Sequence, residues 1–568
     1  MSDTPSPNVC FGEQRLTLSE VVAVARDART VAPLAADVTA RIDGCAAWVA
    51  GVVDDIVAAK ASGRKPAAYY GINTGFGALA GRTALDSADL IQALGRNLVA
   101  SHSVGVGPWF DEPVVRAAML IRAQSLAQGR SGVRPLIVET LRNMLNASVY
   151  PAVPEQGSLG ASGDLAPLAH LALVMCDHPT DGEVFVPHDG SLPVALHLTE
   201  RQDGEQRLWR RVPGAQAMQR VGGKIDLLAK EALALTNGAT FSAALAALAL
   251  HDALHLLDHA PLIVALTLEG MRGFRDPFLP HLHRARGHAA AERFGEQVLA
   301  HVAGSELLDP GDAHTDPARM PPQDPYSVRC APQVHGTIAD TLALARTWVE
   351  MEINAATDNP LIFLELPRRY KTLSGGNFHG EPIAMAMDFL AIALTELASI
   401  SDRRMFMLTD WHPDQPHGLP AFLLDEPADR KGLNSGMMLL QVAAASLVSD
   451  CKTLAHPDSV DSIPSSAGQE DHVSMSLNAA RHARDVVRNV EQVLAMELLC
   501  ATQAIALQLT KPGNAKLRLG AGTRIAYDAV RAAGIAPLTQ DRVLNPDIRK
   551  AVALIRSGRL LRASGGTR

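Results

Sequence analysis

Apolar residues recur at helical spacing through most of this chain of 568 residues. The pattern starts near Leu16, where Thr17 or Ser19 can cap a helix, and it continues in an Ala- and Val-rich form to about Ala61. Residues before about position 14 lack the pattern and are predicted to be disordered, as is the tail after about Leu561. Later long helices are predicted over residues 382–404, residues 436–456, and a longest segment that opens within residues 459–475 and reaches toward Ala504.

Composition favours the same kind of fold. Hydrophobic residues make up 47% of the chain and aromatic residues only 4%, with Ala and Leu dominating, which suits close-packed helices better than a sheet sandwich. No Ser/Gly-rich or highly charged linker divides the sequence. We therefore expect an all-α protein, built as one large helical body or as tightly fused subdomains.

Charge and cysteine usage narrow the kinds of partner. The 52 Lys and Arg against 60 Asp and Glu give a net charge of −8, so no basic field is available for nucleic acid or an anionic membrane surface. The six cysteines show no Cys-x-x-Cys spacing, which argues against a zinc ribbon or a disulfide framework. The N-terminus lacks the features of a signal peptide, and no apolar run reaches the roughly 18 residues that span a bilayer. A small-molecule partner and a cytoplasmic location are predicted.

Residues 157–170 form the most informative stretch. Two clusters of small residues run into an apolar, helix-competent segment, and Asp164 stands where it can cap that helix, whose N-terminus would attract anions. Ala161, Ser162 and Gly163, hereafter the tripeptide, can react with one another. The Gly163 amide nitrogen can reach the Ala161 carbonyl, and loss of two waters, one from Ser162, leaves a methylidene-imidazolone (MIO), an electrophile made from backbone.

Two plainer interpretations compete with this chemistry. A serine between small residues also occurs in ordinary loops that precede helices. The Gly-x-Ser-x-Gly elbow of hydrolases is the other alternative, but Asp164 stands where the last Gly belongs and no strand-like run precedes the segment.

The frame around the tripeptide resembles the aromatic amino acid ammonia-lyase and aminomutase family almost residue for residue, in the form closest to histidine ammonia-lyases. The resemblance covers roughly residues 15–560 and implies an MIO that forms autocatalytically, without an external cofactor. It also implies a fumarase/aspartase-like fold, with a long helical bundle in residues 223–560 and a smaller domain in residues 15–222 that carries the MIO and tyrosine loops. A homotetramer with shared active sites is expected on the same grounds.

A second motif supplies a base. Residues 69–77 form a Gly-rich loop whose backbone can approach a ligand closely, and the absence of Gly-x-Gly-x-x-Gly excludes a dinucleotide fingerprint. The resemblance makes Tyr70 the catalytic base, although a tyrosine in such a loop is otherwise a packing residue. Ser101 and His102 match positions that face the substrate side chain, and Ser-His is the histidine-lyase form of that pair.

Groups for the amine and the carboxylate follow along the chain. Asn237, at the end of a predicted helix, matches the family's substrate-contacting asparagine. Gln323, Tyr326 and Arg329 offer an amide, a phenol and a planar guanidinium within seven residues, and the fork of Arg329 suits a carboxylate. The resemblance places the carboxylate-binding arginine and a tyrosine beside the MIO in this motif.

The remaining candidates come from three further motifs. Phe378 is expected to form a wall near the MIO. Asp450, a candidate for imidazole recognition, stands where histidine lyases usually have Glu, while Gln469 and Glu470 begin a motif in its histidine-lyase form. Residues 181–222 are the least family-like region and are predicted to be a surface insertion.

His251, His255 and His259 share one face of a predicted helix and suggest a zinc site. Asp252, however, replaces the glutamate of the His-Glu-x-x-His signature. Hydrogen-bonded or exposed histidines are the preferred interpretation, and no metal is predicted.

These features together predict the non-oxidative elimination of ammonia from L-histidine to give trans-urocanate. An electrophile holds the amine while a positioned base removes the weakly acidic β-proton. The same site suits tyrosine or phenylalanine, or a 2,3-aminomutase that returns the ammonia, because the motifs do not separate these outcomes. A catalytically inactive scaffold is disfavoured because Tyr70, the tripeptide, Asn237 and Arg329 are all present.

Overall fold

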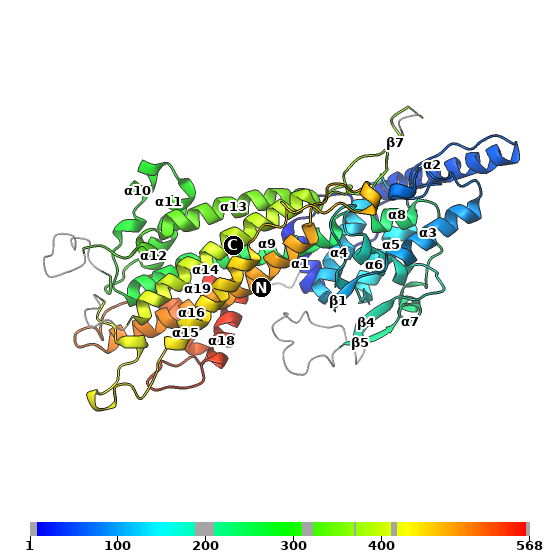
Figure 1. Ribbon diagram of the computed structural model, residues 1–568. Helices are drawn as coiled ribbons and strands as arrows, with labels where there is room; N and C mark the ends of the chain where they lie inside the picture. Colours follow the sequence, from blue (N-terminus) through cyan, green and yellow to red (C-terminus); the bar gives the residue numbers. More distant parts are fainter. Residues whose placement is uncertain (1–7, 188–208, 309–321, 368–370, 411–416, 564–568) are drawn as a thin grey trace. The chain divides into compact units, whose positions relative to one another are not determined.

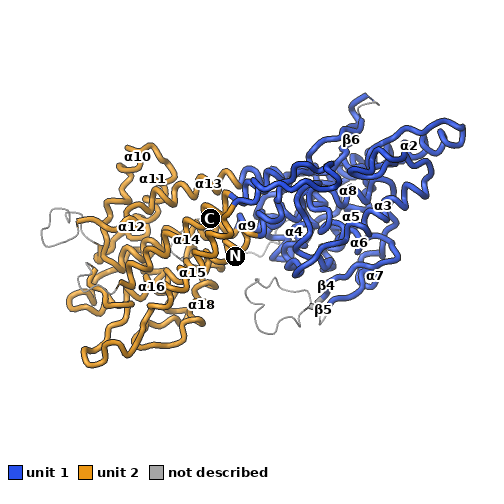
Figure 2. The backbone as a smooth tube through the Cα atoms, in the orientation of Figure 1, with its two compact units in different colours: residues 1–251, 346–388, 457–481 blue, residues 252–345, 389–456, 482–568 orange. Residues whose placement is uncertain are grey.

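The computed structural model describes residues 8–187, 209–308, 322–367, 371–410 and 417–563. Helices dominate these residues, and the strands among them are all short (Figure 1). The described chain divides into two compact units, which Figure 2 colours separately. The all-α class predicted from periodicity and composition is confirmed.

Each unit is assembled from separate stretches of the chain. Unit 1 contains the residues up to His251, Arg346–Asp388 and Pro457–Arg481, and unit 2 contains Asp252–Ala345, Phe389–His456 and the residues from His482 onward. Four boundaries fall inside long helices, which are α9 (Thr240–Gly270), α13 (Ala331–Glu352), α14 (Glu381–Thr409) and α16 (Ser476–Thr510). The sequence predicted one boundary between residues 222 and 223 instead, because a continuous amphipathic helix does not record where its packing partners change.

The N-terminal part of unit 1 surrounds α4 (Glu112–Ala127), in which every residue after the first is buried. Helices α1 and α5 both pack against α4. The other helices of this part are α1 (Leu18–Arg26), α2 (Ala36–Ala61), α3 (Ala88–His102), α5 (Pro135–Asn146), α6 (Leu165–Met175), α7 (Gly214–Met218) and α8 (Glu231–Thr236).

Three small antiparallel sheets also belong to unit 1. They are β1 (Val106–Trp109) with β3 (Pro154–Gln156), β2 (Tyr150–Pro151) with β4 (Glu183–Pro187) and β5 (Trp209–Pro213), and β6 (Leu361–Ile362) with β7 (Thr372–Leu373). The register pairs Tyr150 with Phe185 and Glu183 with Pro213. Strands β4 and β5 belong to the predicted insertion at residues 181–222, and the middle of that insertion, residues 188–208, lies outside the described residues.

Order begins earlier at the N-terminus than predicted. Thr17 caps α1 in a capping box, in which its Oγ1 accepts the Glu20 N–H at 3.2 Å. Within residues 8–14, predicted to be disordered, the Val9 N–H donates to the Thr30 carbonyl at 3.2 Å and Phe11 is buried. Burial of isolated apolar side chains orders this segment without any helical periodicity.

Unit 2 is helical around a buried ion pair. Its remaining helices are α10 (Pro280–Arg286), α11 (Ala289–His301), α12 (Tyr326–Arg329), α15 (Met438–Leu454), α17 (Ala521–Ala532), α18 (Asn545–Arg556) and α19 (Arg559–Ala563). The carboxylate of Glu497 pairs with Arg404 and also accepts hydrogen bonds from Ser401 Oγ at 2.6 Å and Thr267 Oγ1 at 2.9 Å. Such additional donors are what make a buried ion pair tolerable.

The long helices follow their predicted positions. Helix α14 contains the predicted segment 382–404, and α15 contains most of the predicted segment 436–456. Helix α16, with 35 residues, is the longest helix described. By length and composition α9, α14 and α16 are apolar enough to cross a membrane, whereas the sequence was expected to hold no such run. The buried shares of their most apolar windows are 72%, 67% and 83%, so packing inside the protein accounts for their composition.

The histidines of α9 take part in ordinary hydrogen bonds. His255 Nε2 lies 2.7 Å from the Ile555 carbonyl oxygen, and His259 Nδ1 lies 2.8 Å from the His255 carbonyl oxygen. Within the described ranges no group of three or more metal-ligating side chains is found. The preferred interpretation of His255 and His259 as hydrogen-bonded residues is confirmed.

Candidate active site

The tripeptide lies in unit 1 just before α6, with Ala161 and Ser162 half-buried and Gly163 buried. Gly163 has a φ of +73°, which favours glycine. The Gly238 N–H donates to the Ser162 carbonyl at 3.1 Å, and the Asp164 N–H donates to the Gly238 carbonyl at 2.8 Å. A Cβ at position 163 would lie 2.0 Å from the Gly238 carbonyl carbon, so only glycine fits.

Asp164 does not cap α6 with its side chain, and the prediction that it would is wrong. The buried carboxylate accepts hydrogen bonds from Ser158 Oγ at 2.9 Å, from the Ser242 N–H at 2.7 Å and from Ser242 Oγ at 2.9 Å. Burial raises the pKa of Asp164, and these donors oppose the rise. Tertiary partners have replaced the local cap, and they tie the tripeptide loop to the start of α9.

Three segments of unit 1 meet at Gly160, directly before the tripeptide. Its carbonyl oxygen accepts hydrogen bonds from Ser474 Oγ at 3.0 Å and from the Gly380 N–H at 3.4 Å. Phe378, which is half-buried, stands two residues before Gly380, and residues 469–470 stand shortly before Ser474. The structure therefore brings both predicted segments to the tripeptide loop.

Tyr70 and Glu470 approach the same glycine. The Gly77 N–H donates to Tyr70 Oη at 3.3 Å, and a Cβ on Gly77 would lie 3.3 Å from Glu470 Oε1. Glu470 Oε2 is buried and has no hydrogen-bond partner among the described residues. Burial raises the pKa of Tyr70, and the charges of Glu470 and Asp358 add to the rise, while the Gly77 N–H lowers it. The phenol is therefore protonated at neutral pH.

His102 is the last residue of α3, and its ring contacts the carbonyl one turn earlier in the helix. Its Nδ1 lies 2.9 Å from the Leu98 carbonyl oxygen, which can only accept, and 3.0 Å from Ser101 Oγ. The carbonyl favours the tautomer with the proton on Nδ1, in which Nε2 is the acceptor of the neutral ring. Burial lowers the pKa of His102 and favours that neutral form. The Gly105 N–H donates to His170 Nε2 at 3.1 Å, which links this segment to α6.

Asn237 occupies the C-terminal cap of α8, at the helix end that the sequence predicted. Its backbone carbonyl accepts a hydrogen bond from Arg122 Nη1. Its side-chain Oδ1 is buried and has no partner among the described residues. A buried amide oxygen beside the tripeptide is thus available to a ligand.

Unit 2 gathers the carboxylate-binding candidates. Arg329 Nε donates to the Asp324 carbonyl at 3.0 Å, and the guanidinium carbon lies 4.3 Å from the centre of the Tyr326 ring. Tyr326 is 69% exposed, and Gln323 is exposed as well. The terminal nitrogens of Arg329 have no hydrogen-bond partner in the described part of the chain, which leaves its fork open to a carboxylate.

Asp450 lies on an exposed face of α15 in unit 2, beside the buried Cys451. Tyr70, His102 and the tripeptide belong to unit 1. The contacts within the two units do not join Asp450 to them, so its predicted role in imidazole recognition stays a prediction.

The residues at the tripeptide fit the formation of an MIO. Gly163 has no side chain to obstruct its amide nitrogen, and the Ser162 carbonyl is held by a backbone donor. Sequence reasoning missed Ser158 and Ser242 as the partners of Asp164. Ser158 belongs to the same small-residue stretch, so its short distance in sequence could have indicated the contact with Asp164. Ser242 lies 78 residues from Asp164, and no motif in the sequence connects the two.

Fold and site together define a helical protein whose tripeptide fits the formation of a backbone-derived electrophile. The profile of the aromatic amino acid lyase family matches residues 16–532, and the chain belongs to that family. The resemblance drawn from the motifs is confirmed.

Two kinds of named relative share this fold. A histidine ammonia-lyase of Gloeobacter violaceus is 46% identical over 495 residues, covering 87% of this chain and 87% of that protein. The crystal structure of histidine ammonia-lyase from Trypanosoma cruzi is 34% identical with a TM-score of 0.81, and the match covers 98% of this chain and 95% of that one. A tyrosine aminomutase from Streptomyces globisporus is 33% identical with a TM-score of 0.84, covering 98% of each chain.

Proposed function

We propose that this chain eliminates ammonia from L-histidine to give trans-urocanate. The observation that carries the proposal is that the tripeptide shares unit 1 with two groups suited to an imidazole, His102 and Glu470. His102 Nε2 offers a lone pair to a ring N–H, and Glu470 offers a buried carboxylate oxygen that has no partner among the described residues. The histidine ammonia-lyase at 46% identity supports the same substrate.

The tripeptide forms the electrophile by dehydration. The Gly163 nitrogen would bond to the Ala161 carbonyl carbon, whose oxygen leaves as one water with the amide protons of Gly163 and Ser162. The Ser162 hydroxyl would leave with the Ser162 α-proton as the other water. An MIO at this position would supply an electrophile for the substrate amine and so make the amine a better leaving group. Asp164 and Gly238 contribute by holding the backbone on either side of Gly163.

Other residues of the chain bind and orient the substrate. The open fork of Arg329 binds the carboxylate, with Tyr326 and Gln323 beside it for the amine. Asn237 Oδ1 accepts a hydrogen bond from the amine. A second set of residues is assigned to contacts with the imidazole ring of the substrate. Phe378 forms a wall of the site, and the polar members are His102, Gln469 and Glu470, with Asp450 as a further candidate.

Tyr70 is assigned as the base that removes the β-proton. A phenol must first lose its own proton to accept another, and burial raises the pKa of Tyr70. The phenolate fraction therefore grows with pH, and kcat/KM should rise above neutral pH. Tyr70→Phe should be inactive at every pH. A pH-independent rate for the unmodified enzyme would contradict the assignment.

A second candidate function uses the same residues. The tyrosine aminomutase from Streptomyces globisporus has the highest TM-score of the structures compared above, 0.84, and is 33% identical. A 2,3-aminomutase acting on tyrosine or phenylalanine is therefore the alternative. It differs from the first proposal in its product, which is a β-amino acid.

The test is a competition among L-histidine, L-tyrosine and L-phenylalanine at equal concentration, with products identified by chromatography. Urocanate should dominate, because a site built to hydrogen-bond a ring rejects an analogue that leaves its polar groups unpaired. His102→Phe should lower histidine turnover, whereas His281→Phe, at an exposed position, should not. Dominant coumarate or cinnamate would overturn the choice of substrate, and a β-amino acid would favour the second candidate.

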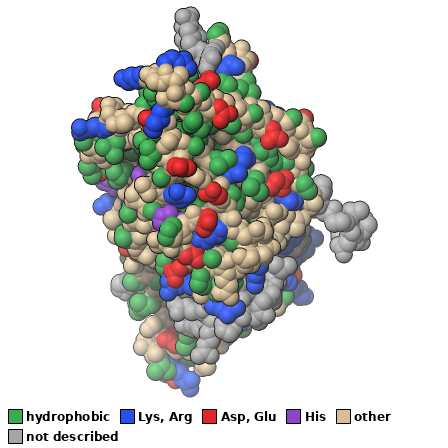
Figure 3. Space-filling view, turned by 90° about the vertical axis from the view of Figure 1, so that its right-hand side faces the viewer, with side chains coloured by type: hydrophobic (Ala, Val, Ile, Leu, Met, Phe, Trp, Pro, Cys, Tyr) green, Lys and Arg blue, Asp and Glu red, His purple; other side chains and the backbone are tan. Residues whose placement is uncertain are grey.

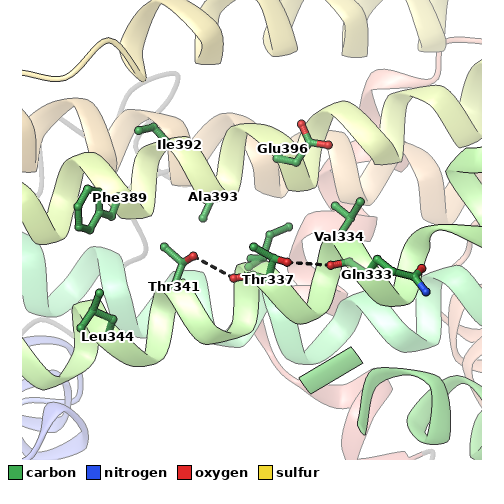
Figure 4. A pocket seen from close by; sticks show the side chains of 10 residues that line it. Gln333, Val334, Thr337, Thr341, Leu344, Phe389, Ile392, Ala393 and Glu396 are labelled. Carbon is green, nitrogen blue, oxygen red and sulfur yellow. Dashed lines mark hydrogen bonds between the residues drawn. The ribbon is translucent and has the colours of Figure 1, made fainter. Parts of the chain in front are cut away.

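We also propose a homotetramer with shared active sites, supported by an apolar groove in unit 2. The groove lies between α13 and α14 and has a volume of about 610 Å³ (Figure 4). Leu344 is 44% exposed on one side and Ile392 is 47% exposed on the other. Large apolar side chains gathered in this way are typical of an interaction surface. Light scattering should find a tetramer that Ile392→Glu weakens and Leu282→Glu, on α10, leaves intact; an active monomer would contradict the assembly.

A soluble, cytoplasmic enzyme that acts on a free amino acid is part of the same proposal. Basic and acidic side chains are interspersed over the face drawn in Figure 3, in keeping with the net charge of −8. A surface of mixed sign does not concentrate charge toward nucleic acid or an anionic membrane. Cell fractionation should recover the activity in the soluble fraction, and recovery with membranes would contradict this location.

A further inference from the structure

The backbone at Asn237 and Gly238 is held between the tripeptide and a buried arginine of α4. On one side, a Cβ on Gly163 would lie 2.0 Å from the Gly238 carbonyl carbon. On the other side, a Cβ on Gly238 would lie 2.9 Å from Arg122 Nη1 and 2.4 Å from Thr357 Oγ1. The peptide therefore fills a space with no room for a side chain in either direction.

Arg122 is fixed in this place by polar partners. Its Nη1 donates to the Asn237 carbonyl and lies 3.5 Å from Thr240 Oγ1, and its Nη2 donates to Ser125 Oγ at 2.9 Å. Ser125 Oγ also accepts the Thr357 N–H at 3.3 Å. The guanidinium is thus one member of a small buried cluster, and its orientation toward the Asn237 carbonyl is determined from two sides.

The charge of Arg122 has no carboxylate in contact among the described residues. The side chain is fully buried, which lowers the pKa of Arg122 to about 10, and the charge of Asp358 opposes that fall. Asp358 is itself paired with Lys230, and both of these side chains are fully buried. A buried cation is costly unless strong hydrogen bonds compensate, and here a backbone carbonyl provides one of them.

One peptide unit connects this charge to the tripeptide. Its carbonyl, at Asn237, accepts from Arg122, and its N–H, at Gly238, donates to the Ser162 carbonyl oxygen at 3.1 Å. Electron density drawn toward the Asn237 oxygen makes the Gly238 N–H a stronger donor, as in cooperative hydrogen-bond chains. In an MIO, the methylidene double bond would be conjugated with the Ser162 carbonyl. Electron density donated to the methylidene carbon would therefore collect on the Ser162 oxygen.

We propose that Arg122 is a positioning residue that seats the Asn237–Gly238 peptide against the tripeptide and, through this peptide, stabilises negative charge on the Ser162 oxygen. The inference rests on the proposed MIO chemistry and does not depend on which amino acid is the substrate. Because Arg122 is fully buried and donates to the peptide carbonyl, its loss should act on the formation and reactivity of the electrophile more than on substrate affinity.

The test compares Arg122→Met with Arg116→Met. Arg116 lies on the same helix, is also buried, and donates from Nε to the Val24 carbonyl at 2.8 Å, so it controls for the loss of a buried guanidinium. Intact mass reports the dehydration of the tripeptide, absorbance reports the conjugated group, and kinetics separate kcat from KM. Arg122→Met should leave part of the protein undehydrated, shift the absorbance maximum of the rest and lower kcat by about tenfold or more, with a smaller change in KM. Arg116→Met should lower stability alone.

An Arg122→Met enzyme that matches Arg116→Met in mass, absorbance and kcat would overturn the inference. Where Arg122→Met fails to fold, Arg122→Lys retains the charge without the fork, and a smaller loss in the same three measurements is expected. A lysine variant equal to the unmodified enzyme in all three overturns the positioning role. An unmodified enzyme that is not dehydrated would instead contradict the proposed function, so the two failures are distinguishable.

Discussion

Replacement of Gly163 by alanine should both destabilise unit 1 and prevent dehydration of the tripeptide. The φ of +73° at this position disfavours any residue with a Cβ, at a cost of about 1–2 kcal/mol. The new Cβ would lie 2.0 Å from the Gly238 carbonyl carbon, whereas ordinary contacts start near 3.4 Å. The difference, 3.4 less 2.0, requires the two backbone segments to separate by about 1.4 Å.

This separation breaks specific hydrogen bonds. The obstacle is backbone and cannot rotate away as a side chain would, so the Gly238 segment must move. Its bonds with the Ser162 carbonyl (3.1 Å) and the Asp164 N–H (2.8 Å) then lengthen beyond hydrogen-bonding range. At about 1 kcal/mol for each bond and about 1–2 kcal/mol for the backbone conformation, the free energy of unfolding should fall by about 3–4 kcal/mol.

Gly63 provides a matched control. Its φ is +69°, close to that of Gly163, and a Cβ there would meet no atom within 4 Å. Gly63→Ala should therefore show the backbone cost alone, about 1–2 kcal/mol, and retain a fully dehydrated tripeptide. Urea unfolding and intact-mass measurement of both variants test the reasoning. Equal losses of stability in the two variants, or complete dehydration of Gly163→Ala, would refute it.

Three further predictions concern single side chains. Ser162→Ala should fold normally, as judged by circular dichroism, and lose nearly all activity because alanine has no hydroxyl to leave as water; a folded variant with near-normal turnover would sink the MIO assignment. Arg329→Lys should lower kcat/KM by about tenfold or more, because an ammonium cannot form the bidentate fork. Arg346→Lys, in an exposed ion pair, should have little effect. Similar kinetics for the two variants would place the carboxylate site elsewhere. Burial, and after it the charge of Asp164, raises the pKa of Glu352 from its usual 4.5 to about 7. The native state therefore binds this proton more tightly than the unfolded chain, so the free energy of unfolding should fall as pH rises from 4.5 to about 7. Glu352→Gln should remove that fall. A variant whose free energy of unfolding keeps the same dependence on pH would contradict this prediction.

Local sequence determined the helices and the candidates for chemistry. Thr17 caps α1 as predicted, and α14 and α15 lie where their apolar periodicity placed them. These features depend on residues within one or two turns of one another, and the information is therefore contained in short windows of sequence. The tripeptide and Arg329 were likewise identified within short motifs, through the resemblance of those motifs to the aromatic amino acid ammonia-lyase and aminomutase family.

Tertiary structure decided which partner each polar group chose. Asp164 has the residue type and position of a helix cap, yet its carboxylate is bound by Ser158 and by Ser242. Tyr70 and Glu470 were predicted from separate motifs, and only the folded chain brings both of them to Gly77.

The division into two units, and the burial of Arg122 behind the tripeptide, were also beyond the sequence. Both depend on contacts between residues far apart in the chain, such as Arg122 with Asn237, which are 115 positions apart. The apolar stripe of a helix indicates that one face will be buried. It does not specify the packing partner, because many other faces of similar composition could cover it equally well. Sequence by itself therefore determined the long helices and the candidate residues. Which face packs on which, and hence which polar atoms meet, was decided by the simultaneous packing of all the helices, since close packing and hydrogen bonding must be satisfied together.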